Sequence, residues 1–410
     1  MGRLLPILAI LFAFSAFSQD NIANKEYDYI NYEANELKFD EQNSELMHFF
    51  HLFDSITMKK EGRINIVHIG GSHVQAGKMS NTIRRNILDQ YPDFVGPRGL
   101  IFPYSAAKKS NNPADYKVEK SDYFSLVRNV YDTLEKPLGV SGIAVHTSGN
   151  HEYIKISLLD SAVDYSTNKI VLLGFSEGGN VVPKIKTSKK TYTPDEVDVN
   201  LRRYTYHIDS HIDEFTIQLP LKNKETFTLT GILLDNDKSG ITFHSIGVNG
   251  ADVPAYLKCD YFIEDMELIC PDLVIFGIGI NDASKSDFDT TIFRSNYHEL
   301  IGNIKAVNPH CAFIFMTNND SFRRIEKGKY EVNEKGMLAR DVFYRLADDT
   351  NGAVWDLFEI MGGLGSMETW YKNGVARADR IHFTNEGYHV IGNLFSESFF
   401  RQLEYYRNLK

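Results

Sequence analysis

The sequence contains little cysteine: three residues, Cys259, Cys270 and Cys311, in a chain of 410. Three cysteines are too few for a disulfide-stapled scaffold, and an odd number leaves at least one unpaired within the chain. None of them shows the paired Cys or Cys/His spacing of a structural zinc site. The chain must therefore fold around a hydrophobic core, and its 43% hydrophobic and 12% aromatic residues suit an ordinary globular protein.

Blocks of basic residues and long apolar runs are also missing. The net charge is −10 and no Lys/Arg-rich block stands out, which argues against a nucleic-acid or anionic-membrane partner. Beyond the N-terminus no run of about 18 apolar residues occurs, so no membrane span is expected. We find no internal repeat and no low-complexity tract.

The N-terminus, "MGRLLPILAILFAFSAFSQD", has the three parts of a secretory signal. Arg3 supplies the positive charge, Leu4 to Phe14 the apolar stretch, and Ala16 and Ser18 the small residues before a cleavage site. The apolar stretch is too short to span a membrane. We therefore expect a signal peptide over residues 1–18, cut after Ser18, and a periplasmic or secreted protein.

Two styles of secondary structure alternate along the rest of the chain. The pattern predicts a helix over residues 43–59, a buried strand over 64–69 and a helix over 74–88. After about residue 243, apolar strands such as "DLVIFGIG" and "CAFIFMT" again alternate with helical patterns. Strands and helices in alternation predict a parallel sheet with helices on both faces.

The middle of the chain differs. Between residues 116 and 243, short alternating runs such as "YIKISLL" and "ETFTLTGILL" are separated by Asn, Asp, Gly and Pro, which is typical of an antiparallel sandwich. The predicted organisation is thus one α/β domain, residues 19–115 and 244–410, interrupted by a β-sandwich over 116–243.

Four loops of the α/β part combine polar residues with glycine. They are "GGSH" with Ser72, "GVNGAD" with Gly250, "GIGINDA" with Asn281, and "ADRIH" with Asp379 and His382. Each has an ordinary interpretation alone, as a helix N-cap, a turn or a surface loop. Open parallel sheets, however, bind ligands beyond the carboxyl ends of their strands, where the first three loops fall.

Together these loops contain the parts that serine acyl transfer needs. A serine hydroxyl is a weak nucleophile until an imidazole accepts its proton, and a carboxylate must orient that imidazole. We assign Ser72 as nucleophile, His382 as base and Asp379 as the orienting carboxylate. The Ser72 N–H, Gly250 and the Asn281 amide are the candidate donors to the oxyanion.

The four blocks, in this order, resemble the SGNH or GDSL-type hydrolase family, named for its Ser, Gly, Asn and His. The resemblance implies a flavodoxin-like three-layer α/β/α fold and no metal or organic cofactor. The inserted β region and "GPRGLIFPYSAAKKSNNPADY" before it are similar to the branch of bacterial peptidoglycan O-acetylesterases, in which a carbohydrate-binding-module-like sandwich interrupts the catalytic domain. The implied function is a carbohydrate esterase acting on an O-acylated, in particular O-acetylated, glycan. One position departs from the family: Gly71 stands where the family usually has aspartate.

Three other functions remain open from the sequence. A polysaccharide O-acetyltransferase would use the same serine, and an inactive glycan-binding protein would keep only the scaffold. A lipase is the weakest alternative, since no apolar lid segment is evident.

Two further motifs look catalytic and are interpreted as structural. "GFSEG", around Ser176, matches a nucleophile elbow but is followed by "GNVVPK", which does not start a helix. "HIDSHID" places His207, Asp209, His211 and Asp213 on one face of a strand, which indicates a solvated polar face rather than a metal site.

Overall fold

The computed structural model describes residues 26–40, 44–106, 110–159, 167–222, 224–236 and 238–409. The α/β part is built around a six-stranded sheet with the order β1-β20-β17-β16-β2-β15. The strands are β1 Leu37–Lys38, β2 Arg63–Gly70, β15 Gly240–Gly247, β16 Leu273–Gly277, β17 Ala312–Met316 and β20 Ala353–Trp355. All pairs are parallel except β1 with β20. Ignoring β1, the chain order across the sheet is 2-1-3-4-5, the flavodoxin-like arrangement.

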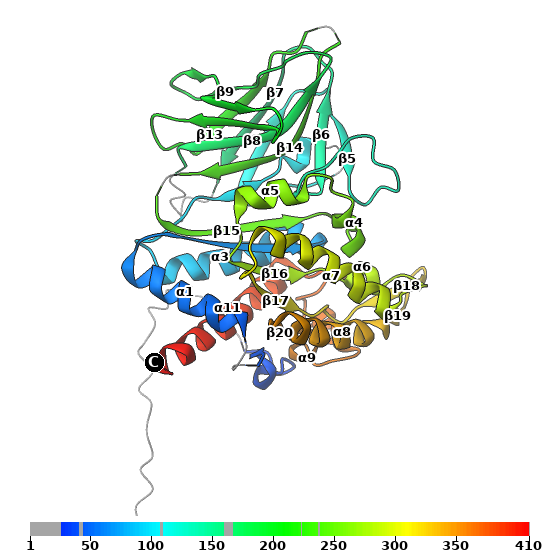
Figure 1. Ribbon diagram of the computed structural model, residues 1–410. Helices are drawn as coiled ribbons and strands as arrows, with labels where there is room; N and C mark the ends of the chain where they lie inside the picture. Colours follow the sequence, from blue (N-terminus) through cyan, green and yellow to red (C-terminus); the bar gives the residue numbers. More distant parts are fainter. Residues whose placement is uncertain are drawn as a thin grey trace, which may run out of the picture.

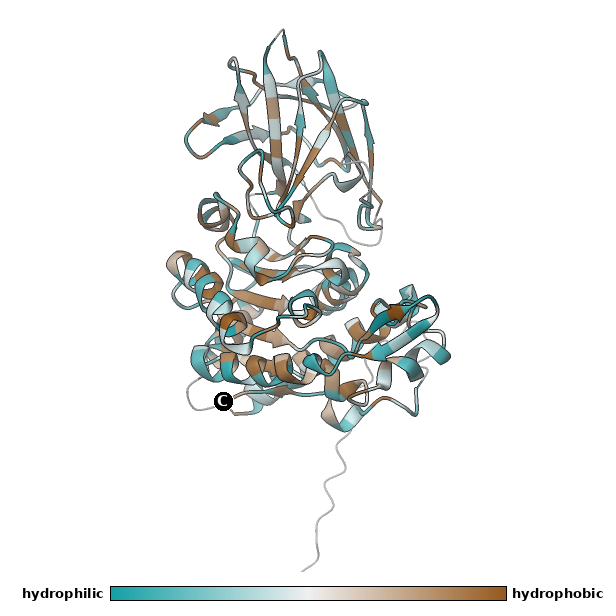
Figure 2. Cartoon of the chain, turned by 90° about the vertical axis from the view of Figure 1, so that its right-hand side faces the viewer, coloured by the Kyte–Doolittle hydropathy of each residue, from teal (hydrophilic) through white to brown (hydrophobic). Residues whose placement is uncertain are grey.

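The residues of β2 alternate between two hydrophobic layers because successive side chains of a strand point to opposite faces. Ile64 and Ile66 pack in one cluster, Val67 and Ile69 in the other. The first cluster includes residues of helices α1 Glu45–Lys59, α3 Lys78–Gln90, α9 Leu357–Ile360, α10 Ser366–Lys372 and α11 Asn385–Asn408. The second includes residues of helices α4 Val253–Leu257, α5 Phe262–Ile269, α7 Thr290–Val307 and α8 Lys335–Thr350. Figure 2 shows the hydrophobic strands between these helices, whose outer sides are largely hydrophilic.

The inserted region forms two antiparallel sheets that stand on the α/β domain (Figure 1). One contains β4 Tyr116–Lys120, β7 Glu152–Leu158, β9 Lys184–Lys186, β10 Thr191–Tyr192 and β13 Glu214–Leu219. The other contains β3 Gly99–Ile101, β5 Ser125–Arg128, β6 Ile143–Thr147, β8 Lys169–Glu177, β11 Glu196–Asp198, β12 Arg203–His207 and β14 Thr226–Asp235. The predicted fold class, an α/β sheet interrupted by an antiparallel β domain, is confirmed.

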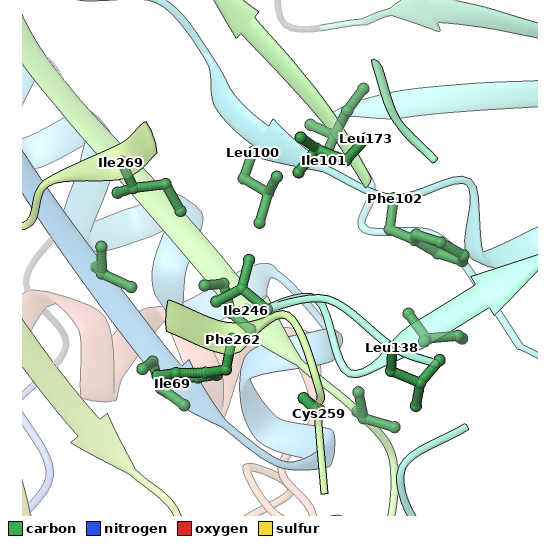
Figure 3. Packing of buried hydrophobic residues seen from close by; sticks show 14 of the residues in the cluster. Ile69, Leu100, Ile101, Phe102, Leu138, Leu173, Ile246, Cys259, Phe262 and Ile269 are labelled. Atoms are coloured by element: carbon green, nitrogen blue, oxygen red, sulfur yellow. The ribbon is translucent and has the colours of Figure 1, made fainter. Parts of the chain in front are cut away.

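The two parts share one hydrophobic core. Leu100 and Leu173 of the sandwich belong to the same buried cluster as Ile69, Ile246 and Phe262 of the α/β domain (Figure 3). Apolar surface buried across this junction stabilises the folded state by about 25 cal/mol per Å². The sandwich is therefore part of the same folded unit as the α/β domain and is not attached only by a linker.

Local differences from the predicted elements have identifiable causes. The single helix expected over residues 74–88 is two helices, α2 Ser72–Gln75 and α3, separated at Gly77 with φ +73°. A side chain there would meet Pro113 at 2.6 Å, so only glycine fits. The hairpin of β18 Phe322–Glu326 and β19 Lys329–Val332 was not expected from the sequence.

The strands of the sandwich begin at β3, before residue 116, and the parallel sheet resumes at Gly240 with β15. The expected signal peptide, residues 1–18, lies outside the described residues. Among the residues that the structure describes, no helix combines the length and the apolar character needed to cross a membrane.

Candidate active site

Three glycines align the candidate loops at one edge of the parallel sheet. Gly70 of β2 pairs in register with Gly247 of β15 and Gly277 of β16, so three strands end at the same level. A Cβ at Gly70 would lie 2.7 Å from the Gly277 carbonyl oxygen, and one at Gly247 would lie 2.3 Å from the Gln75 nitrogen. The absence of side chains therefore lets the Ser72 loop pack directly on its neighbours.

Ser72, His382 and Asp379 form a continuous series of hydrogen bonds. Ser72 is the first residue of α2, and its Oγ lies 2.8 Å from His382 Nε2. His382 Nδ1 lies 2.9 Å from Asp379 Oδ2, while Asp379 Oδ1 accepts the N–H groups of Ile381 and His382 at 3.0 Å. With Nδ1–H donated to Asp379, Nε2 is left to accept the Ser72 hydroxyl. The structure thus brings together three predicted residues from two loops about 310 positions apart.

Asp379 remains ionised at any ordinary pH. Partial burial raises its pKa, but the hydrogen bonds from the His382 ring and from the two backbone N–H groups lower it more, so the net pKa lies far below the usual range. A carboxylate that stays charged can stabilise an imidazolium at His382 throughout a catalytic cycle.

His73, the residue after Ser72, packs beside His382 and is not the general base of the site. Its ring is 8% exposed and lies 5.2 Å from the His382 ring, and its Nδ1 is 2.9 Å from the Tyr388 hydroxyl. Burial, followed by the charge of His382, lowers the pKa of His73 to about 3. A neutral ring at this place packs against His382 without competing for protons.

The two other predicted oxyanion donors lie on adjoining loops. Residues 248–251 form a turn in which Ala251 N–H donates to the Val248 carbonyl at 2.9 Å and Gly250 has φ +83°, the type II pattern that favours glycine. Asn281, in α6 Ile280–Ala283, donates an amide N–H to the Ala251 carbonyl at 2.9 Å. An asparagine amide has a second N–H, which remains for a substrate oxygen.

Gly71, the departure from the family pattern, borders the same amide. A Cβ at this position would lie 3.3 Å from Asn281 Nδ2 and 3.4 Å from the Ala251 carbonyl oxygen. The hydrogen bond between Ser72 and His382 forms with glycine at position 71, so the loop does not need an aspartate there to hold Ser72.

Sequence reasoning missed the residues that hold these loops. Gln75 Oε1 accepts the Asn249 N–H at 2.7 Å, and Arg128 of β5 donates to the Asn249 carbonyl. Arg128 comes from the sandwich, so the inserted domain directly contacts the loop of Gly250. No local sequence pattern predicts these contacts, because the residues that form them are more than 100 positions apart in the chain.

The two motifs interpreted above as structural, "GFSEG" and "HIDSHID", do not contribute residues to this site. Ser176 lies within strand β8, with no helix after it, and its hydroxyl donates to the Gly179 carbonyl at 2.9 Å. In "HIDSHID", His207 contacts Asp195 and Asp209 contacts Lys190. Within the described ranges, no group of three or more His, Cys, Asp or Glu side chains is arranged to hold a metal ion.

Asp282, the residue after Asn281, makes stability depend on pH. It is 5% exposed and its carboxylate accepts the Val253 N–H at 3.2 Å. Burial, then the charge of Asp252, raise the pKa of Asp282 from 3.8 to about 7. An acid with a raised folded-state pKa stabilises the fold below its unfolded pKa, so this contribution is lost as pH rises from about 4 to about 7.

We therefore expect the free energy of unfolding of Asp282→Asn to decrease less between pH 4 and pH 7 than that of the wild type, by a few kcal/mol. The asparagine still offers the Val253 N–H a hydrogen-bond acceptor. Urea unfolding at pH 4, 5.5 and 7 measures it. Asp272, whose pKa burial raises to about 6, contributes a fall of the same sign in both proteins, so the comparison is the difference between the two curves. Parallel curves would show that Asp282 does not titrate in this range.

Comparison with known proteins gives a match to one family model and matches to several solved structures. Residues 231–390 match the sequence model of the GDSL-like Lipase/Acylhydrolase family. The solved structure of a peptidoglycan O-acetylesterase matches with a TM-score of 0.71 at 18% identity, over 92% of this chain and 99% of that one. No curated protein sequence matches the chain.

Two further solved structures match less extensively. An acetyl xylan esterase has a TM-score of 0.31 at 19% identity, over 38% of this chain and 81% of its own. A family two carbohydrate esterase from Cellvibrio japonicus has a TM-score of 0.29 at 9% identity, over 71% of this chain and 98% of its own.

Proposed function

We propose that the chain, of which residues 231–390 match the GDSL-like lipase/acylhydrolase family, is an exported serine esterase of that family that removes O-acetyl groups from a polysaccharide. The observation that carries the proposal is the hydrogen-bonded series from Ser72 through His382 to Asp379. It supplies a nucleophile, a base in one tautomer and a charged orienting group.

In the proposed mechanism, Ser72 Oγ attacks the acetyl carbonyl carbon while His382 Nε2 takes its proton. The carbonyl oxygen becomes an oxyanion that the Ser72 N–H, the Gly250 N–H and the Asn281 amide stabilise. When the tetrahedral intermediate collapses, the sugar oxygen leaves with the proton from Nε2, and acetyl remains on Ser72. A water molecule then gives a proton to Nε2 and attacks the acetyl-serine, and acetate leaves as Ser72 recovers its proton.

The openness of the site supports a polymeric substrate. The side chains of His382 and Asp379 are 31% and 46% exposed, so an acyl group carried on a large chain reaches them without entering a deep cavity. The choice of acetyl and of a polysaccharide rests on the likeness to the peptidoglycan O-acetylesterase, whose chain is covered almost completely. We further propose export through the signal peptide; N-terminal sequencing of the mature protein should then begin at Gln19.

The substrate proposal is tested by acetate release from O-acetylated peptidoglycan and O-acetylated xylan. The same polymers stripped of acetyl groups by mild base serve as controls. We expect acetate from at least one acetylated polymer and, on aryl esters, a preference for acetyl over octanoyl. Preference for octanoyl would contradict the acetyl assignment. Acetyl appearing on an added acceptor glycan, in place of free acetate, would identify a transferase.

A further inference from the structure

The turn that carries the acid–base pair contains a residue in a conformation that it does not favour by itself. Arg380, between Asp379 and His382, has φ +55°, in the left-handed region. For a residue other than glycine this conformation is unfavourable, so surrounding contacts must hold it. The same turn directs the Ile381 and His382 N–H groups at the Asp379 carboxylate.

Two aromatic rings and a carboxylate hold the Arg380 side chain. Its guanidinium carbon lies 4.3 Å from the ring centre of Tyr330 and 4.4 Å from that of Tyr371. Arg380 Nε donates to Glu368 Oε2 at 2.6 Å, and the side chain is only 17% exposed. We call Arg380, Tyr330, Tyr371 and Glu368 the arginine clamp. A planar guanidinium suits this arrangement because it stacks on rings and donates in its own plane.

The clamp joins the turn to the β18–β19 hairpin, at the margin of the α/β domain (Figure 1). Tyr330 lies on β19, and the Phe322 N–H of β18 donates to the Arg380 carbonyl at 3.1 Å. Most other hairpin residues are exposed, so the hairpin adds little to the hydrophobic core. Of its half-buried residues, Phe322 packs against the core and Tyr330 contacts Arg380.

We propose that Arg380 is a positioning residue for the catalytic reaction, and that the hairpin holds it so that His382 stays within hydrogen-bond distance of Ser72. The inference rests on the proposed esterase function. Misplacing a catalytic group by about 1 Å costs up to about 100-fold in rate, so loosening the clamp lowers kcat without weakening ground-state binding of a small ester.

Three variants test the clamp. Arg380→Gly permits the left-handed backbone but removes the clamp, Tyr330→Ala removes one ring, and Tyr330→Phe keeps the ring. We expect the first two to lower kcat for an aryl acetate roughly 10- to 100-fold with KM within about twofold, and Tyr330→Phe to remain at the wild-type level. Counting reactive serines with a fluorophosphonate separates slower turnover from a smaller folded fraction.

A second readout needs no substrate. The His382 Nδ1–H, hydrogen-bonded to Asp379, gives a low-field proton NMR resonance, assigned by its loss in His382→Gln. We expect this resonance to broaden or vanish in Arg380→Gly and Tyr330→Ala, and to persist in Tyr330→Phe. If Arg380→Gly and Tyr330→Ala retain it, together with wild-type kcat, the proposal is wrong. If the wild type shows the resonance but hydrolyses no ester, the proposed function fails while the resonance in the variants still decides the role of the clamp.

Discussion

Replacing Ser72 by alanine is expected to lower kcat/KM for an aryl acetate by at least about 10³-fold, because the variant retains the oxyanion donors but has no atom to acylate. His382→Ala is expected to lose a similar factor, since the Ser72 hydroxyl would keep its proton. The double variant should be little worse than either single one, because the two residues act as a unit. Initial rates with equal amounts of folded protein measure all three.

Ser176→Ala is the matched control for this prediction. Ser176 lies in a motif that resembles a nucleophile elbow, but it sits in strand β8 of the sandwich with its hydroxyl bonded to Gly179. Its replacement should leave the rate unchanged. Full activity in Ser72→Ala with loss in Ser176→Ala would move the reaction to the sandwich and overturn the site described above. Equal activity in all variants would assign the turnover to a contaminant.

Replacing Asp115 by alanine is expected to destabilise the protein by about 3–5 kcal/mol. Asp115 is 4% exposed and its carboxylate faces both Arg98 and Arg84, the latter at 3.5 Å. Burial raises the pKa of Asp115, but the two arginines lower it more, to about 2, so it is charged at neutral pH. Without it, two buried guanidinium groups lose the carboxylate they share.

Urea unfolding at pH 7 measures this loss, and Asp93→Ala is the control. Asp93 forms an ion pair with Lys60, but its side chain is 77% exposed, and exposed pairs contribute little. Because the pKa of Asp115 is depressed, its contribution is present above pH 4 and is lost as pH falls toward 2. An unchanged midpoint in Asp115→Ala would mean that water or rearranged side chains solvate the arginines, and would contradict their burial.

Asp115, Arg84 and Arg98 form a buried ion-pair cluster that also connects the inserted domain with the α/β domain. Arg84 lies on α3 of the α/β domain and also donates to the carbonyl of Phe243, in the middle of the sheet strand β15. Asp115 directly precedes β4, where the chain enters the five-stranded sheet of the sandwich. The cluster therefore ties the entry into the inserted domain to the α/β core, so its disruption is expected to affect both parts together.

The sequence alone determined the fold class and the identity of the candidate site residues. Apolar strands alternating with helices before and after a β-rich stretch can be read locally, because hydrophobic periodicity follows secondary structure. The residues Ser72, Gly250, Asn281 and His382 stand out because each follows a predicted strand or precedes a predicted helix, in the order of one family. Such patterns depend on near neighbours in the chain and need no knowledge of packing.

The tertiary structure decided how these residues are held. Only folding brings His382 to 2.8 Å from Ser72, buries Asp282, and places Arg128 of the sandwich on the loop of Gly250. The interruption of the helix at Gly77 and the contact of the Tyr330 ring with Arg380 likewise depend on partners distant in the sequence. Hydrophobic patterning specifies which face of an element is buried, but not which distant side chain it meets. That choice is made by register, burial and close packing, and these exist only once the chain has folded.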